Sequence, residues 1–367
     1  MGRVELPRVS SPDPKSGASA NSATFARSIG YIIVYHFDNP VSATLFVLSY
    51  LAVMSSFQLA LLASPLFLTS IIAQPSASPT DATRIRTLAK AAPRLPLELS
   101  ELKLLPPREI GFVSSVASDR QGNFYLLQRD LKSDPIIVID KTGKILRSWG
   151  KGLFTIPHSI RLDPSGNVWT TDANTSMVYQ FTPNGRKLLE INVGGQPASI
   201  TSEFRGTTDT AFGPNGHVYI SDGYGNARIL EYDKNGKKIR QWGKAGNGPG
   251  EFRLPHGIAV HPNGNVYVAD RENDRVQWFN SKGEYLGEWN FAGRVFTLAF
   301  TPKGDLFVSA QPRDVPLGAE GWLFKVNQSD GSILGKVDGA GHSLTIAPNG
   351  SIVIGKRPDH ILLFSAK

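Results

Sequence analysis

A short glycine-containing turn recurs six times in the second part of the chain. Successive turn glycines lie 40 to 50 residues apart, and short runs such as GIAVH and VYVAD flank the turns. Alternation of apolar and polar residues on both sides of a glycine turn is typical of a β-hairpin. The pattern therefore predicts six equivalent β-units. Their turns read DRQGN, DPSGN, GPNGH, HPNGN, TPKGD and APNGS, with Gly122, Gly166, Gly216, Gly264, Gly304 and Gly350.

A second turn follows about 20 residues later in most units, as in KTGK, PNGR, KNGK, SKGE and SDGS. It joins a third strand-like run to a fourth, so each unit contains four antiparallel strands. Four-stranded units of this length are typical of propeller blades. We therefore expect an all-β fold, a six-bladed β-propeller formed by residues 96–367.

The two ends of the repeat region indicate how the ring closes. After the last turn, the chain contains only the runs SIVIGK and HILLFSA, so the sixth blade lacks its outer strand. The segment LELSELKLLPP before the first blade contains a strand-like run. Because proteins avoid exposed sheet edges, we expect the strand near 99–105 to complete the last blade.

The N-terminal part has a different composition. Residues 39–80 contain no charged side chain, and about 20 apolar residues cross a bilayer. We therefore divide this part into a polar segment (1–40), a transmembrane anchor or signal region (41–73) and a flexible linker (74–95). The positive excess before the apolar run places the propeller on the extracytoplasmic side, either anchored in the membrane or secreted.

Composition excludes several kinds of site. The chain has no cysteine, which excludes disulfides, thiolate metal ligands and a cysteine nucleophile. The net charge is +8, but the basic residues are scattered among turns. A nucleic acid partner is therefore not expected.

Three histidines share one position of the repeat. Because blades are nearly equivalent, residues at the same distance from the turn glycine should surround the ring axis at one level. Histidines in alternate blades would form a triangle with an open position, as in catalytic zinc sites. The alternative is histidines left in phase by duplication, which predicts them in neighbouring blades too. Eight residues before the glycines stand Ser114, His158, Thr208, His256, Phe296 and His342.

Arginines occupy a second shared position, at the end of the second strand and on the rim that carries the histidines. Arginine at this rim could bind a carboxylate through paired hydrogen bonds. The alternative is ordinary solvent-exposed arginine. Seven residues after the glycines stand Arg129, Ala173, Gly223, Arg271, Gln311 and Arg357.

Two stretches resemble known families. RLPHGIAVHPNGNVYVADRENDRVQWF is similar to an NHL repeat, and YISDGYGNARILEYDKNGKKIRQWG resembles peptidyl-α-hydroxyglycine α-amidating lyase, the lyase domain of peptidylglycine α-amidating enzymes. The resemblance extends over about residues 110–350. It implies one catalytic zinc ion on His158, His256 and His342, with Tyr224, Arg129 and Arg271 as catalytic residues.

The resemblance also implies a reaction, the cleavage of the C–N bond of an N-acyl α-hydroxyglycine to an amide and glyoxylate. Zinc would polarise the substrate hydroxyl. Tyr224 could take its proton if Arg129 and Arg271 stabilise the phenolate, and the arginines could hold the carboxylate. The family links a structural Ca²⁺ to an aspartate where this chain has Ser343, which puts calcium in doubt.

The expected partners are a small peptide or N-acyl-hydroxyglycine-like substrate and, through the N-terminal segment, a membrane. No copper monooxygenase domain is recognisable in the chain, so a separate oxygenase is an expected source of substrate. Two other functions stay open. One is a non-catalytic NHL propeller that binds a protein, peptide or glycan at the cell envelope. The other is a lactonase-like metal-dependent hydrolase, although such propellers prefer acidic metal ligands.

Overall fold

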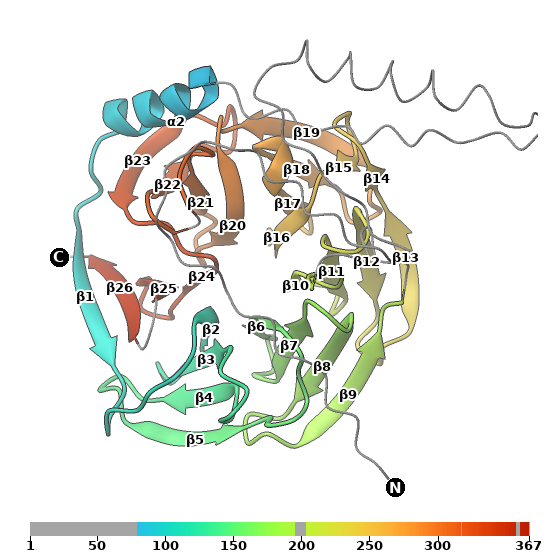
Figure 1. Ribbon diagram of the computed structural model, residues 1–367. Coiled ribbons are helices and arrows are strands. Elements are labelled where there is room, and N and C mark those ends of the chain that lie inside the picture. The colour runs from blue at the N-terminus through green and yellow to red at the C-terminus, as the bar shows by residue number, and fades with distance from the viewer. Residues whose placement is uncertain (1–78, 195–202, 317, 357–359, 367) are drawn as a thin grey trace, which may run out of the picture. The chain divides into compact units, whose positions relative to one another are not determined.

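Six four-stranded sheets form a ring around a central channel (Figure 1). The computed structural model describes residues 79–194, 203–316, 318–356 and 360–366. Within each sheet, neighbouring strands pair antiparallel. The all-β, six-bladed propeller predicted from the repeated turns is confirmed.

The first three blades each run outward from the channel along the chain. Blade one contains β2 (Val113–Ser118), β3 (Phe124–Gln128), β4 (Ile136–Ile139) and β5 (Ile145–Trp149). Blade two contains β6 (Pro157–Leu162), β7 (Val168–Asp172), β8 (Met177–Phe181) and β9 (Lys187–Asn192). Blade three contains β10 (Asp209–Phe212), β11 (Val218–Asp222), β12 (Arg228–Tyr232) and β13 (Lys238–Trp242).

The last three blades repeat this order. Blade four contains β16 (Pro255–Val260), β17 (Val266–Asp270), β18 (Arg275–Phe279) and β19 (Tyr285–Asn290), preceded by the short pair β14 (Lys244–Ala245) and β15 (Glu251–Phe252). Blade five contains β20 (Arg294–Phe300), β21 (Leu306–Gln311), β22 (Trp322–Val326) and β23 (Ile333–Asp338). Blade six contains β24 (Leu344–Ile346), β25 (Ile352–Lys356), β26 (His360–Ala366) and β1 (Leu97–Lys103).

Blade six joins the two ends of the propeller. The strand β1 pairs antiparallel with β26, from Leu97 opposite Ala366 to Lys103 opposite His360. It occupies the outer position that the repeat pattern leaves empty, and it corresponds to the strand predicted near 99–105. The pairing connects the first and last strands of the propeller, so no blade lacks its outer strand (Figure 1).

The recurring turns explain why glycine is required. Gly122 has φ +82° and donates its N–H to the carbonyl of Asp119 at 3.1 Å. The Asp119 carboxylate accepts N–H bonds from Gln121 and Asn123. Only glycine adopts this left-handed conformation without strain, and an aspartate three residues before the glycine stabilises the turn by accepting the N–H two residues after itself.

Glycines of the second turn leave space for tryptophans of the preceding blade. A Cβ atom on Gly185 would lie 2.9 Å from the Trp149 ring, and one on Gly283 would lie 2.8 Å from Trp242. Neighbouring blades therefore interlock at their outer strands. This packing holds the six sheets at the spacing that the channel residues need.

The prediction of a flexible linker over 74–95 is wrong for its described part. Residues Pro79–Ala91 form the helix α2, which lies beside β23 at the outside of the ring (Figure 1). Ala82, Ile85 and Ala89 are buried at helical spacing, and Ile85 packs into the core between blades four and five. The Ser-, Ala- and Pro-rich composition conceals this narrow apolar stripe.

The predicted polar segment (1–40) and the predicted anchor or signal region (41–73) lie outside the described residues. Within the part of the chain that the structure describes, no helix has the length and apolar character needed to cross a bilayer.

Candidate active site at the channel mouth

The three histidines predicted as metal ligands converge on the channel axis. His158 lies on β6, His256 on β16 and His342 just before β24. Their ring centroids are 5.0 Å apart for His158 and His256, 4.6 Å for His158 and His342, and 4.8 Å for His256 and His342. One nitrogen from each ring lies within 4.8 Å of the other two, so the three side chains could hold a metal ion.

Backbone carbonyls of the intervening blades orient the three imidazoles. Each Nδ1 lies at hydrogen-bond distance from a carbonyl oxygen, which can only accept, so Nδ1 carries the proton. The unprotonated Nε2 atoms then carry the lone pairs, as in metal-binding histidines held by an outer hydrogen bond. The three pairs are His158 with Thr208 (2.6 Å), His256 with Phe296 (2.8 Å) and His342 with Ser114 (2.8 Å).

The environment keeps two of these imidazoles neutral. Burial lowers the pKa of His158 and of His256 well below the usual value, and the positive charge of a protonated His342 would lower both further. Both rings are only 2% exposed. Neutral imidazole is the form that coordinates metals, so the donor set fits a divalent ion such as zinc.

Tyr224 lies directly against the open side of the histidine triangle. It follows β11, and its hydroxyl oxygen is 3.1 Å from Nε2 of His158 and 3.3 Å from Nε2 of His256. Nη1 of Arg271 lies 3.5 Å from the same oxygen. The structure therefore brings Tyr224 and Arg271 to the place where a fourth metal ligand would bind.

Glu272 holds Arg271 in position. Its carboxylate accepts from Nε of Arg271 at 2.8 Å and from Nη1 of Arg313 at 2.7 Å. Although burial opposes its ionisation, the charges of Arg271, Arg313 and Arg294 lower the pKa of Glu272 to about 2. The carboxylate is therefore ionised at neutral pH, and it limits the movement of the Arg271 guanidinium.

Arg129 reaches the same mouth from blade one. Its Nε donates to the carbonyl of Pro157 at 3.0 Å, immediately before His158. Its guanidinium carbon lies 5.1 Å from the centre of the Phe112 ring and 5.4 Å from that of Phe204. Two aromatic rings and one carbonyl therefore fix this cation close to the histidines.

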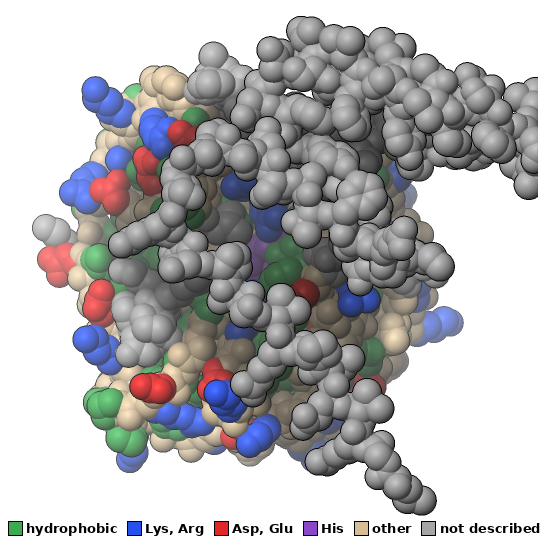
Figure 2. Space-filling view, in the orientation of Figure 1, with side chains coloured by type: hydrophobic (Ala, Val, Ile, Leu, Met, Phe, Trp, Pro, Cys, Tyr) green, Lys and Arg blue, Asp and Glu red, His purple; other side chains and the backbone are tan. Residues whose placement is uncertain are grey.

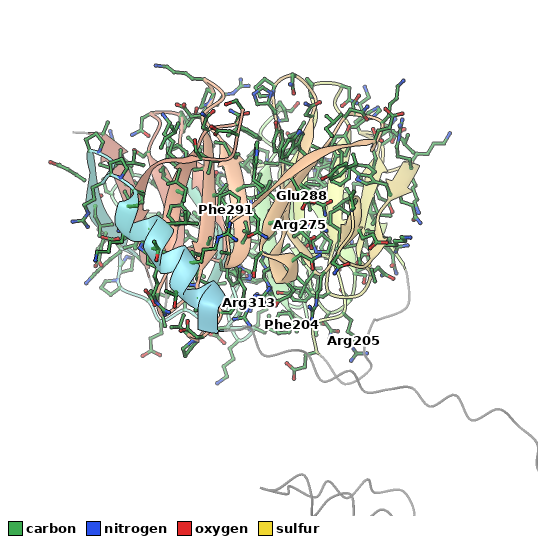
Figure 3. All side chains as sticks on the ribbon, turned by 90° about the horizontal axis from the view of Figure 1, so that it is seen from above. Phe204, Arg205, Arg275, Glu288, Phe291 and Arg313 are labelled. Carbon is green, nitrogen blue, oxygen red and sulfur yellow. The ribbon has the colours of Figure 1, made fainter. Side chains whose placement is uncertain are left out.

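These side chains surround a cavity of about 340 Å³ at the channel mouth. A cavity of this volume is large enough for a small organic ligand. Figure 2 shows a histidine near the centre of the ring, beside Lys or Arg and hydrophobic side chains. Figure 3 places Phe204 and Arg313 at the same rim of the ring. The cavity is lined by Arg129, Tyr224, Arg271, Gln311 and His342, and by three aromatic residues, Phe112, Phe204 and Phe296.

Known proteins match both the repeat and the site region. The NHL repeat model matches residues 252–279. A probable peptidyl-alpha-hydroxyglycine alpha-amidating lyase of Caenorhabditis elegans is 28% identical over 296 residues, which cover 70% of this chain and 83% of the relative. A peptidyl-glycine alpha-amidating monooxygenase of Mus musculus is 34% identical over 252 residues, which cover 59% of this chain. This protein is a six-bladed β-propeller that contains an NHL repeat and resembles the amidating lyases.

The extent of these matches differs among the relatives. The chain spans about a quarter of the length of the monooxygenases that it matches, 25% for the mouse protein. Among solved structures, virginiamycin B lyase from Staphylococcus aureus has a TM-score of 0.52, with 15% identity over 73% of this chain and 99% of that chain. This likeness shows a common fold.

Below the histidines, an ion pair lies in the channel of the propeller. Nη2 of Arg161 lies 2.6 Å from the Asp209 carboxylate, and Nη1 donates to the carbonyl of Leu344 at 2.6 Å. Ser343, the residue that puts calcium in doubt, lies 2.8 Å from the hydroxyl of Ser115. Positive charge at this level of the channel comes from a guanidinium of the chain itself.

Sequence reasoning missed two residues of this site. Gln311 lines the mouth cavity and stands at the same repeat position as Arg129 and Arg271, but it was not interpreted as functional. Glu272 follows Arg271 directly, which was the available signal for a carboxylate that fixes the arginine. Arg357, the third arginine at this repeat position, lies outside the described residues.

Proposed function

We propose that this protein is a zinc-dependent lyase that cleaves the C–N bond of N-acyl α-hydroxyglycines. The observation that carries the proposal is the Tyr224 hydroxyl, 3.1 and 3.3 Å from Nε2 of two of three converging histidines. Two arginines line the same cavity. The name of the relative from C. elegans supports the same reaction class.

The charges at the mouth suit the proposed substrate. Its carboxylate would bind Arg129 or Arg271, whose guanidinium groups suit paired hydrogen bonds to a carboxylate. Binding there would direct the hydroxyl toward Tyr224 and the histidine triangle. The acyl group would lie against Phe112, Phe204 or Phe296, because apolar surface gains free energy when it leaves water.

Tyr224 is the residue placed to move the proton. Zinc held by His158, His256 and His342 would supply Lewis acidity at the substrate hydroxyl. The Tyr224 oxygen would accept the hydroxyl proton as the new carbonyl of glyoxylate forms. The C–N bond breaks with its electron pair on nitrogen, and the proton ends on that nitrogen to give the amide. The Arg271 guanidinium beside Tyr224 would stabilise the phenolate.

We further propose that the propeller works outside the cytoplasm, tethered or exported through residues 41–73, on substrate made by a separate oxygenase. The positive excess before the apolar run supports this orientation. Protease treatment of intact cells tests it, because an extracytoplasmic propeller is accessible without lysis. Protection of the propeller until lysis would contradict this localisation.

The direct test of activity is glyoxylate release from α-hydroxyhippurate. We expect the zinc-loaded protein to release one glyoxylate for each benzamide, and we expect chelator treatment to abolish release. Tyr224→Phe with unchanged metal content is the matched control for the proton transfer. If the zinc-loaded wild-type protein releases no glyoxylate, the lyase proposal is wrong.

A further inference from the structure

Gln311 presents a buried hydrogen-bond donor that has no acceptor in the described part of the chain. It ends β21 in blade five and is 2% exposed. Its Oε1 accepts the N–H of Gly318 at 2.9 Å, which fixes the orientation of the amide group. Its Nε2 has no hydrogen-bond partner, and the residue lines the mouth cavity.

An unpartnered donor at this place requires an explanation. Buried polar groups are almost always hydrogen-bonded, and those that are not cost free energy unless a ligand or water satisfies them. Gln311 occupies the same repeat position as Arg129 and Arg271, which line the same cavity. From this repeat position, a ligand in the cavity would therefore meet two charged donors and one neutral donor.

The three oxygen groups of an N-acyl α-hydroxyglycine match these surroundings. The carboxylate suits a guanidinium, because charge-assisted bonds are the stronger ones. The hydroxyl suits the histidine triangle and Tyr224. The acyl carbonyl is the remaining oxygen, and it is neutral, as is the Gln311 amide. A neutral donor can bind it without drawing the carboxylate away from the arginines.

We propose that Nε2 of Gln311 donates a hydrogen bond to the acyl carbonyl oxygen of the substrate. The identity of this ligand rests on the proposed lyase function. When the C–N bond breaks, its electron pair moves to the amide nitrogen and is shared with the acyl oxygen until the nitrogen takes the proton. A donor to that oxygen stabilises the leaving amide, as donors do at other developing oxyanions. Gln311 is therefore a substrate-binding residue of the reaction.

Two unreactive ligands separate this role from a purely structural one. Hippurate contains the benzoyl amide and the carboxylate but lacks the hydroxyl that reacts. 4-Phenylbutanoate has the same chain length, with methylene groups in place of the amide. Titration calorimetry with the full-length, zinc-loaded protein measures the affinity of both. The quantity of interest is the ratio of the two affinities, because effects on the carboxylate or on the phenyl ring cancel in it.

We compare Gln311→Glu and Gln311→Met with the wild-type protein. Gln311→Glu keeps an oxygen for the Gly318 N–H and removes the donor, and Gln311→Met removes both. We expect both variants to lower the affinity ratio of hippurate to 4-phenylbutanoate by about 3- to 10-fold, the effect of one net hydrogen bond. Gln121→Met, an exposed residue in a blade-one turn, is the control that leaves the ratio unchanged.

An unchanged ratio in both variants would overturn the proposal. This outcome includes an equal loss of affinity for the two ligands, because Gln311 would then act only by holding Gly318. These binding results do not depend on turnover. A wild-type protein that binds hippurate but releases no glyoxylate from α-hydroxyhippurate would instead refute the lyase function.

Discussion

The repeat position eight residues before the turn glycine has two roles that alternate around the ring. It contributes either a histidine side chain or a backbone carbonyl that orients such a side chain. In blades two, four and six it supplies an imidazole, and in blades three, five and one it supplies the carbonyl that accepts from Nδ1. Because the acceptors belong to the backbone, their orientation depends on blade spacing and not on the side chains of Thr208, Phe296 or Ser114. The metal site is therefore a product of the ring geometry.

Replacing a histidine and replacing the residue whose carbonyl accepts from it should have sharply different effects. We expect His342→Ala to weaken zinc binding by more than about 100-fold, since loss of outer-shell partners alone costs about 10- to 100-fold. Ser114→Ala keeps the carbonyl that accepts from His342, so it should retain zinc. Competition with a chelator of known affinity measures both. Wild-type zinc affinity in His342→Ala would show that the imidazole is not a ligand.

Tyr224→Phe removes the hydroxyl that lies beside the Nε2 atoms of two histidines. We expect kcat for glyoxylate release to decrease by about 10²- to 10⁴-fold, the usual contribution of a general acid or base. Zinc content should stay unchanged, because the imidazoles remain. A variant that keeps wild-type kcat would exclude Tyr224 as the proton acceptor.

The metal-free protein should lose stability in mild acid. Burial, reinforced by neighbouring positive charge, lowers the pKa values of His158 and His256 in the folded state, whereas the unfolded chain takes up protons near pH 6.5. The two histidines therefore do not change the free energy of unfolding well above pH 6.5. The free energy of unfolding decreases as the pH falls below about 6.5. The slope is at most about 1.4 kcal/mol per pH unit for each histidine.

Urea unfolding of the metal-free protein at several pH values measures this slope. The double variant His158→Gln/His256→Gln removes both titrating groups, so its free energy of unfolding should depend less on pH. The same slope in the wild-type protein and the double variant would show that His158 and His256 do not cause the pH dependence.

At the scale of elements, the helix α2 is an integral part of the propeller. Its Arg86 forms ion pairs with Asp314 at 2.8 Å and with Glu320 at 2.7 Å, on the loop between β21 and β22. The same loop contributes Gly318 to the mouth cavity. The helix therefore contacts the loop that shapes one side of the site.

Ile85→Ala tests whether the helix is docked in solution. Ile85 is fully buried between blades four and five, and truncating such a residue costs about 2–5 kcal/mol. We expect a decrease of this size in the free energy of unfolding. The neighbouring Arg84 is exposed, so Arg84→Ala should cause little change. If both variants have wild-type stability, the helix does not contribute to the fold.

The ion pair in the channel should contribute to the stability of the fold. Arg161 and Asp209 have side chains that are 13% and 6% exposed. Arg161→Met would leave a buried carboxylate without its cation, which costs about 3–5 kcal/mol. The double variant Arg161→Met/Asp209→Asn removes the charge as well and should recover part of this loss. Equal stability of the single and double variants would contradict the role of the pair.

Over the whole molecule, the repeat phase was sufficient to predict the fold and the meeting of three distant histidines. The prediction was possible because a ring of equivalent blades places residues at the same repeat position at the same distance from the axis. The helix α2 was missed because its burial depends on contacts with blades four and five. Gln311 was missed because an unsatisfied donor is recognisable only once all partners of the side chain are placed. The channel pair Arg161–Asp209 likewise joins neighbouring blades in a way that spacing does not reveal.

The ring also determines how a ligand reaches the site. The pair Arg161–Asp209 lies in the channel below the histidines, and the mouth cavity with Arg129, Arg271 and Gln311 lies above them. A substrate in this cavity would therefore lie on the side of the histidines away from the ion pair. The arginines that we propose to bind the substrate carboxylate line the same cavity as Tyr224.

The most direct test of a catalytic zinc site on the three histidines is a zinc titration of the metal-free protein. The rate of glyoxylate release from α-hydroxyhippurate is measured at each zinc concentration. If three imidazoles bind one catalytic ion, the rate rises linearly with added zinc and levels off at about one ion per chain. Absence of glyoxylate at every zinc concentration, or a rate that does not respond to zinc, would contradict the proposed zinc-dependent lyase.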